Sequence, residues 1–256
     1  MASHKMMHIG TYEGEVGKYV FLPGSPERSE KISKYLDNPK KIAYNREFLT
    51  FTGSLEGVPV SVTSTGIGGP SAGIAVEELY QCGARTMIRI GTCASVSPKV
   101  RRGDIVIPNG AVRMEGVSKH YLPIEFPAVP DFELLKALED AAIKLGYPYN
   151  VGVSITKASF YTQNEPETKP VGYDLINRWN AYVKGGATST SMESAPLFII
   201  AGCLGIRAAT VLVSATNDKT YSSDKKDYPG DVEHRAIETG IEAMRMIIKQ
   251  DQEAAV

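Results

Sequence analysis

The sequence of 256 residues contains little cysteine, almost no net charge and no long apolar run. Its three cysteines are odd in number and lack CxxC or metal-ligand spacing, which favours reduced thiols in the core. The formal net charge of −1 gives no electrostatic reason to expect nucleic acid or an anionic membrane as partner. No apolar run approaches the roughly 18 residues of a membrane span, and residues 1–10 lack the apolar core of a signal peptide. These absences predict a cytoplasmic protein with a small ligand.

Two nucleotide-binding signatures are also missing. The loop at residues 65–71 has the order strand, glycines, helix, but it matches neither GxGxxG nor the P-loop lysine pattern. The sequence therefore disfavours dinucleotide and triphosphate cofactors, and close backbone packing is the alternative explanation for these glycines.

Short β-rich runs alternate with helical patterns along the chain. This alternation predicts one α/β domain over residues 1–256, with a mixed, mostly parallel central sheet and helices on both faces. The expected strands are residues 18–23, 59–65, 86–92, 104–108, 151–156 and 208–214. The expected helices are residues 26–36, 71–82, 131–145, 192–204 and 232–249. Residues 114–130 and 159–170 are expected to be loops that cover a substrate at the carboxyl ends of the strands.

The apolar run at residues 86–92 carries a full positive charge, Arg89, in a strand that should be buried. An unpaired cation in a core costs several kcal/mol, so either a carboxylate lies beside it or the cavity receives an anion. Gly91 and Thr92 favour the anion, because they allow close backbone approach and supply hydrogen-bond donors where the strand should end. The alternative is an edge-strand arginine that faces solvent.

The loop at residues 22–28 has the features of a second anion site. Ser25 is placed as a helix N-cap and Pro26 as the first helical residue, so the helix N-terminus faces a glycine turn. Arg28 can add a guanidinium one turn into the helix. Helix capping alone, with Arg28 in solvent, explains the same residues.

Polar residues in the C-terminal half belong to the same sheet edge. Glu193 stands at the head of an apolar helix, where it can accept paired hydrogen bonds from sugar hydroxyls or simply complement the helix dipole. Residues 213–219 deliver further polar groups, although a polar turn would also account for them.

Together these segments resemble the uridine phosphorylase branch of the hexameric nucleoside phosphorylases over nearly the whole chain. The resemblance rests on residues 23–28, 45–48, 64–71, 89–92, 126–129 and 192–195, in this order. It implies the nucleoside phosphorylase fold and phosphorolysis of a nucleoside, with uridine expected, to free base and ribose 1-phosphate in pyrimidine salvage or catabolism. It also implies no cofactor, because inorganic phosphate is a substrate. The implied assembly is a homo-oligomer, a hexamer built as a trimer of dimers, without nucleic acid or membrane partners.

The resemblance also assigns roles to individual residues. The implied phosphate ligands are Gly24, Arg28, Arg89 and Thr92, with Arg46 from a neighbouring subunit. The implied ribose contacts are Thr92, Met192 and Glu193, with His8 reaching a neighbour's 5′ hydroxyl. The candidate base contacts are Cys93, Ala94, Phe160, Gln163, Thr168 and Lys169. A structural K⁺ or another monovalent cation at the dimer interface would be held by Glu47, Ile67 and Ser71.

The base-binding loop departs from the family pattern at one point. Phe160 would stack on the base and Gln163 would bind its polar edge, but the arginine expected beside them is missing. Thr168 occupies its position and Lys169 follows. Lysine lacks the planar fork of arginine, so we expect altered base recognition or leaving-group stabilisation unless Lys169 compensates.

Three further departures keep a purine substrate open. Ala94 replaces a glycine, Ser191 replaces a glutamate, and Asp218 lies close to where uridine enzymes carry arginine. Purine-specific relatives use an aspartate in this region to protonate N7, so Asp218 is the candidate acid if its pKa is raised. A purine nucleoside phosphorylase is therefore the alternative enzyme.

A different class of protein is also considered, a non-catalytic nucleoside-binding protein on the same fold. Neither this protein nor a hydrolytic nucleosidase has an evident use for a complete set of phosphate ligands. Phosphate dependence of turnover would separate the three.

Overall fold

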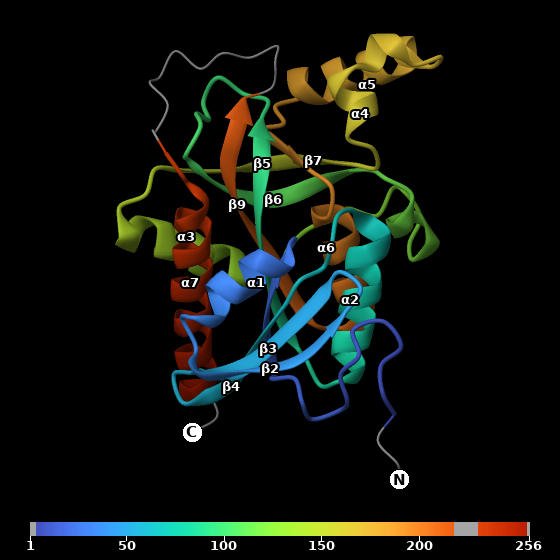
Figure 1. Ribbon diagram of the computed structural model, residues 1–256. Helices are drawn as coiled ribbons and strands as arrows, with labels where there is room; N and C mark the ends of the chain where they lie inside the picture. Colours follow the sequence, from blue (N-terminus) through green and yellow to red (C-terminus); the bar gives the residue numbers. More distant parts are fainter. Residues whose placement is uncertain (1–3, 218–229, 255–256) are drawn as a thin grey trace.

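The computed structural model describes residues 4–217 and 230–254, and in these residues a mixed nine-stranded sheet is covered by helices (Figure 1). The strands are β1 (Tyr19–Pro23), β2 (Asp37–Asn45), β3 (Phe48–Leu55), β4 (Val58–Thr63), β5 (Thr86–Ser95), β6 (Ile105–Met114), β7 (Tyr149–Lys157), β8 (Ser189–Ser191) and β9 (Arg207–Asn217). The α-helices are α1 (Pro26–Ser33), α2 (Gly69–Gln81), α3 (Phe132–Leu145), α4 (Tyr161–Asn164), α5 (Gly172–Lys184), α6 (Ser194–Leu204) and α7 (Glu233–Ala254). Two short 3₁₀ helices are η1 (Val117–His120) and η2 (Pro166–Thr168).

The strand order confirms the predicted mixed α/β architecture. The order is β2-β3-β4-β1-β5-β8-β7-β6-β9, and β9 also pairs with β5. Parallel pairs join β1 to β4 and β5, β5 to β9, and β7 to β6 and β8. Antiparallel pairs join β3 to β2 and β4, β5 to β8, and β6 to β9. The strands β5, β8, β7, β6 and β9 therefore form a closed ring of neighbours, whereas β2 has β3 as its single neighbour among the described strands.

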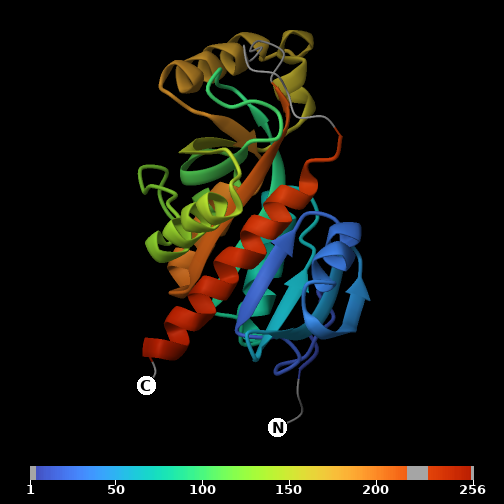
Figure 2. The same ribbon diagram turned by 90° about the vertical axis from the view of Figure 1, so that its left-hand side faces the viewer.

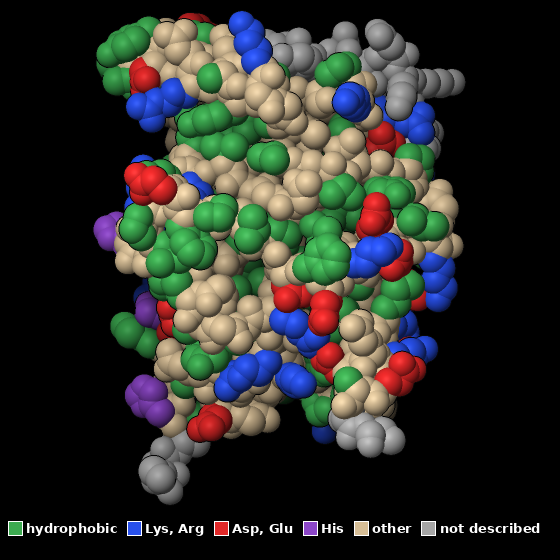
Figure 3. Space-filling model, turned by 180° about the vertical axis from the view of Figure 1, so that it is seen from behind, with side chains coloured by type: hydrophobic (Ala, Val, Ile, Leu, Met, Phe, Trp, Pro, Cys, Tyr) green, Lys and Arg blue, Asp and Glu red, His purple; other side chains and the backbone are tan. Residues whose placement is uncertain are grey.

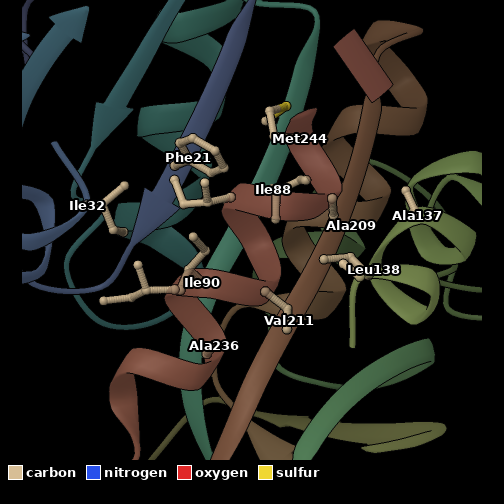
Figure 4. Close-up of a cluster of buried hydrophobic side chains, with 14 of the residues drawn as sticks. Phe21, Ile32, Ile88, Ile90, Ala137, Leu138, Ala209, Val211, Ala236 and Met244 are labelled. Carbon is tan, nitrogen blue, oxygen red and sulfur yellow. The ribbon is translucent and has the colours of Figure 1, made fainter. Parts of the chain in front are cut away.

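Helices cover both faces of the sheet, as the sequence predicts. One buried cluster joins α1, α3 and α7 to strand residues such as Ile88 and Ile90, and Figure 4 shows part of it. A second cluster on the opposite face joins α2 and α6 to Met87. Alternate residues of β5 therefore point to opposite faces, and Arg89 lies on the same side as Met87. Figure 2 shows α7 running along the sheet, and it passes close to β5 at Gly240, where an added Cβ would lie 2.7 Å from Ile90 Cδ1.

The sequence missed the β2–β3 pair and α5. The residues of β2 are mostly exposed and polar, so they carry no apolar alternation from which a strand could be inferred. The segment expected as a loop, residues 159–170, contains α4 and η2, and α5 follows it directly. The strand expected at residues 104–108 continues to Met114, which shortens the loop expected at residues 114–130.

A buried arginine near the end of β6 organises that loop. Arg113 donates to Ser118 Oγ at 2.9 Å and to the carbonyl oxygen of Ser118 at 2.9 Å. It also donates to the carbonyl oxygens of Leu122 at 2.7 Å and Phe126 at 2.6 Å, and to that of Pro123. One guanidinium therefore satisfies backbone acceptors that the irregular chain leaves without a ladder partner.

The surface carries both signs of charge. Figure 3 shows acidic and basic side chains interspersed over one face, as the formal net charge of −1 leads one to expect. None of the helices in the described part of the chain is long and apolar enough to cross a membrane.

Candidate active site

A cavity of about 1110 Å³ lies at the carboxyl ends of β1, β5 and β7, beneath α4 and α5, which are at the top of Figure 1. The predicted site residues that line it are Gly24, Arg28, Ile67, Arg89, Thr92, Cys93, Ala94, Phe160, Gln163, Met192 and Glu193. They come from segments far apart in the sequence, which parallel strands bring to one edge of the sheet. The structure therefore gathers most of the predicted phosphate, ribose and base residues around one space.

Arg89 pairs with Glu193 inside this cavity. Arg89 Nη2 lies 2.6 Å from Glu193 Oε2, and the two side chains are only 7% and 6% exposed. The other carboxylate oxygen accepts from the backbone N–H of Gly68 at 2.8 Å. Gly68 has φ +88, a conformation that favours glycine, and it directs this N–H at Glu193. The buried carboxylate that the sequence left as one alternative is thus present, and the solvent-facing arginine is excluded.

The same guanidinium has one donor that remains unsatisfied. Arg89 Nη1 reaches Thr65 Oγ1 at 3.4 Å, but its buried Nε has no hydrogen-bond partner in residues 4–217 and 230–254. An unsatisfied buried donor is costly, so the pairing with Glu193 does not fully compensate for the burial of Arg89.

Arg28 forms an ion pair with Glu233, the first residue of α7. Glu233 Oε1 accepts from Arg28 Nε at 2.6 Å, and Glu233 Oε2 accepts from Lys31 Nζ at 2.5 Å. Ser25 caps α1 by accepting from the backbone N–H of Arg28 at 3.3 Å, as predicted. A Cβ added to Gly24 would lie 3.8 Å from Arg89 Nη2 and 3.9 Å from Arg28 Nη1. Both guanidinium groups therefore converge beside the backbone of Gly24.

The carboxylate of Glu233 makes the free energy of unfolding depend on pH. Burial alone would raise the pKa of Glu233, but the hydrogen bond from Lys31 and the charge of Arg28 outweigh it and lower this pKa. Because the folded-state pKa is depressed, the contribution is complete above the usual glutamate pKa and is lost as the pH falls through the lower folded value.

We expect Glu233→Gln to lower the free energy of unfolding by about 1–2 kcal/mol at pH 7. The gap to wild type should begin to narrow near the usual glutamate pKa of about 4.3 and close only as the pH falls through the lower folded value; urea titrations from pH 7 to pH 3 measure it. A gap of constant size over this range would contradict the assignment. Glu242→Gln, which removes a surface partner of Lys144, is the matched control and should show the smaller gap.

The opposite end of the cavity combines aromatic, amide and cationic groups. Lys157, the last residue of β7, is buried and lines the cavity. Its Nζ donates to Gln163 Oε1 and lies 5.2 Å from the centroid of the Phe160 ring. Sequence reasoning missed Lys157, although its position directly after a buried strand was the same signal that drew attention to Thr92.

Helix α5 supplies an apolar wall that sequence reasoning also missed. Leu175, Ile176 and Trp179 line the cavity from this helix. The helix begins against η2, since a Cβ added to Gly172 would lie 2.3 Å from the carbonyl oxygen of Pro166. The wall and the base-binding loop are therefore packed together as one unit.

Cys93 does not provide a reactive thiolate here. Burial raises the pKa of its thiol to about 12, and the positive charge of Lys157 offsets only part of that effect. A thiol in this state is a poor nucleophile at neutral pH. Cys93 is therefore not a candidate nucleophile for chemistry in the cavity.

Two predicted site residues lie away from the cavity of their own chain. His8 Nδ1 is 2.6 Å from Glu78 Oε1 on α2, and the backbone N–H groups of His8 and Ile9 also donate to that carboxylate. Arg46 is exposed in the β2–β3 turn with φ +53. Both residues are placed at the surface, where a neighbouring chain could meet them.

Two residues predicted to contact the base, Thr168 and Lys169, do not line the cavity. Thr168 is exposed, and its hydroxyl donates to the carbonyl oxygen of Glu165 at 2.8 Å. In the described part of the chain, the cavity is lined by Pro166 and Glu167 but by neither Thr168 nor Lys169.

The predicted cation residues lie close together. Ser71 Oγ donates to Glu47 Oε1 at 2.6 Å, and this hydrogen bond is the main cause of the lowered pKa of Glu47. Ile67 follows Gly66 in the adjoining loop and is 79% exposed. Asp218 lies outside the described residues. Within residues 4–217 and 230–254, no three histidine, cysteine, aspartate or glutamate side chains form a metal-binding group.

The cavity thus brings two guanidinium groups, a carboxylate, an aromatic ring and an amide to one space. Several known proteins are similar in sequence to this chain over nearly its full length. A family model described as "Phosphorylase superfamily" matches residues 18–249. A uridine phosphorylase of Treponema pallidum is 43% identical over 244 residues, covering 95% of this chain and 95% of that protein. A uridine phosphorylase of Thermococcus kodakarensis is 40% identical over 250 residues, covering 96% and 88%. A guanosine phosphorylase of Halorubrum lacusprofundi is 34% identical over 225 residues, covering 86% and 89%.

Proposed function

The chain belongs to the phosphorylase superfamily, and from this premise we propose that it is a uridine phosphorylase. Such an enzyme is a pentosyltransferase that converts uridine and inorganic phosphate to uracil and ribose 1-phosphate. The observation that carries the proposal is the convergence of Arg28 and Arg89 beside Gly24, next to the carboxylate of Glu193. A protein that only bound nucleosides, or that hydrolysed them with water, would have no use for paired guanidinium groups at this place.

Phosphate and the nucleoside would each bind a different set of side chains in the cavity. Phosphate would bind Arg28, Arg89, Thr92 and the backbone of Gly24 as an oxyanion held by charge-assisted hydrogen bonds. The ribose would lie beside it, where Glu193 accepts hydrogen bonds from its 2′ and 3′ hydroxyls and Met192 packs on the ring. This arrangement would bring a phosphate oxygen near C1′ and supply the proximity that the reaction requires.

Catalysis would then consist of positioning and charge stabilisation. The C1′–N1 bond breaks with its electron pair moving to the base, and a phosphate oxygen forms the new bond to C1′. The proton of the monohydrogen phosphate dianion ends on the base, so uracil leaves neutral and ribose 1-phosphate keeps two negative charges. No side chain forms a covalent intermediate, and donors that bind the departing base more tightly as its charge grows lower the barrier.

Uridine is preferred over a purine nucleoside as the proposed substrate. The two uridine phosphorylases compared are 43% and 40% identical to this chain, whereas the guanosine phosphorylase is 34% identical. The ring of Phe160 and the amide of Gln163 suit a flat base with carbonyl oxygens. A purine enzyme would need an acid for N7, and the candidate, Asp218, lies outside the described residues.

The proposal includes an assembly in the cytoplasm. We propose a hexamer, as a trimer of dimers, in which His8 and Arg46 complete the site of a neighbouring chain, consistent with their surface positions. We also propose that no cofactor is needed and that a monovalent cation binds near Glu47, Ile67 and Ser71, where the carboxylate and hydroxyl oxygens lie together.

The test is base release from uridine and from inosine, each with and without phosphate, in one assay. We expect uracil release that depends on phosphate. Hypoxanthine release alone would move the assignment to purines and direct attention to Asp218. Uracil release without phosphate would identify a nucleosidase, and either outcome would overturn the proposal.

A further inference from the structure

Lys157 places a positive charge at the base end of the cavity, where the sequence offered no arginine. On the basis of the proposed phosphorolysis of uridine, we infer that Lys157 stabilises the negative charge that develops on the departing base. It would act with Gln163 and Phe160 as a single base-binding unit.

The geometry fixes how this unit is oriented. A lysine ammonium can only donate hydrogen bonds, so the group of Gln163 that faces Lys157 is the oxygen Oε1. The amide nitrogen of Gln163, which is a hydrogen-bond donor, consequently points away from Lys157. The ammonium also lies 5.2 Å from the centroid of the Phe160 ring, a cation–π distance that holds the charge against the ring on which a base would stack.

In the described part of the chain, Lys157 is the cation at this end of the cavity. Among the described residues that line the cavity, the cationic side chains are Arg28, Arg89 and Lys157. The two arginines converge beside Gly24 and are paired with Glu233 and Glu193. Lys157 contacts Gln163 and Phe160 and influences the Cys93 thiol, and all three are candidate base contacts.

The chemistry of uracil gives such a cation a role in the rate. As the C1′–N1 bond breaks, the electron pair moves onto N1 and is delocalised over the carbonyl oxygens O2 and O4. Uridine itself carries little charge on these atoms, so a nearby ammonium binds the transition state more strongly than the ground state. Because Lys157 is only 6% exposed, water screens this interaction poorly. The proton that neutralises uracil comes from phosphate, so the role of Lys157 requires no proton transfer.

The test removes the charge and varies the leaving group. Lys157→Met and Lys157→Gln are both neutral, and the second keeps a group that can donate to Gln163. We expect either variant to lower kcat for uridine by about 10²-fold, with a smaller change in KM. The loss should shrink for 5-fluorouridine, because fluorine withdraws electrons and makes the base a better leaving group. Lys157→Arg should restore most of the rate with uridine.

Each outcome bears on the inference. Equal losses for uridine and 5-fluorouridine, or a rise in KM alone, would overturn it, because a structural role would not depend on the leaving group. Lys144→Met is the matched control; it lies on α3 in a surface pair with Glu242 and should leave both rates unchanged. If the wild-type enzyme fails to release uracil with phosphate in the same assay, the proposed function fails first. If it succeeds and the neutral variants match it, the inference alone fails.

Discussion

Arg89→Met is expected to lower phosphate-dependent uracil release by about 10³-fold and to reduce the free energy of unfolding by about 3–5 kcal/mol. The two effects have one cause. The substitution removes the guanidinium proposed to hold phosphate, and it leaves the carboxylate of Glu193, only 6% exposed, without its cation. Steady-state kinetics with varied phosphate and urea unfolding measure the two losses. Phosphate at 100 times its Kd should stabilise the wild type by about 2.7 kcal/mol and the variant far less.

The double variant Arg89→Met/Glu193→Gln separates stability from activity. Neutralising the stranded carboxylate should recover part of the lost stability, while turnover stays at least about 10³-fold below that of the wild type. Arg245→Met is the matched control, because its pair with Glu56 lies at the surface and should contribute less than about 1 kcal/mol. Full activity in Arg89→Met would contradict the proposed phosphate site.

Arg113→Met is expected to cost about 3–5 kcal/mol of unfolding free energy, which is as large as the loss at Arg89. The guanidinium of Arg113 is 7% exposed and donates to Ser118 Oγ and to the carbonyl oxygens of four loop residues. Methionine fills a similar volume but donates nothing, so the carbonyl oxygens of Leu122 and Phe126 lose the donor that Arg113 provides, while those of Ser118 and Pro123 keep only their backbone N–H donors. Urea unfolding at pH 7 measures the loss.

Arg113→Lys provides the informative comparison. Lysine keeps the charge but cannot reproduce the planar fork, so it should recover less than half of the stability lost in Arg113→Met. Arg178→Met, which breaks an exposed pair with Asp174 on α5, should change stability by less than about 1 kcal/mol. If Arg113→Met were as stable as this control, the role of Arg113 in ordering the loop would be wrong.

The sequence predicted the central strands and the convergence of Arg28 and Arg89 because both depend on local signals. The charge of Arg89 in an apolar strand, and the Ser-Pro start of α1 beside Gly24, are visible within a few residues. Of the explanations offered for Arg89, the buried carboxylate is present as Glu193, and the binding of an anion stays a prediction.

The rest depends on contacts between distant segments. The residues near Arg28 in the sequence do not predict its ion pair with Glu233, which comes from α7. The role given to Lys169 rested on its place in an aligned loop, whereas Lys157 reaches the cavity because β7 ends beneath α4. The strand β2 escaped prediction because its pairing with β3, and not an apolar pattern, makes it a strand.

That same strand governs how copies of this chain can meet. A strand with one neighbour exposes unpaired backbone groups, which are a template for edge-to-edge pairing and aggregation. Here the exposed edge carries Pro39, Lys40 and Lys41, and its register with β3 shifts between Asp37 and Lys40. Proline removes a backbone donor, the lysines repel a second copy, and the irregular register prevents a flat template. These features of β2 therefore disfavour association of two copies through edge-to-edge strand pairing.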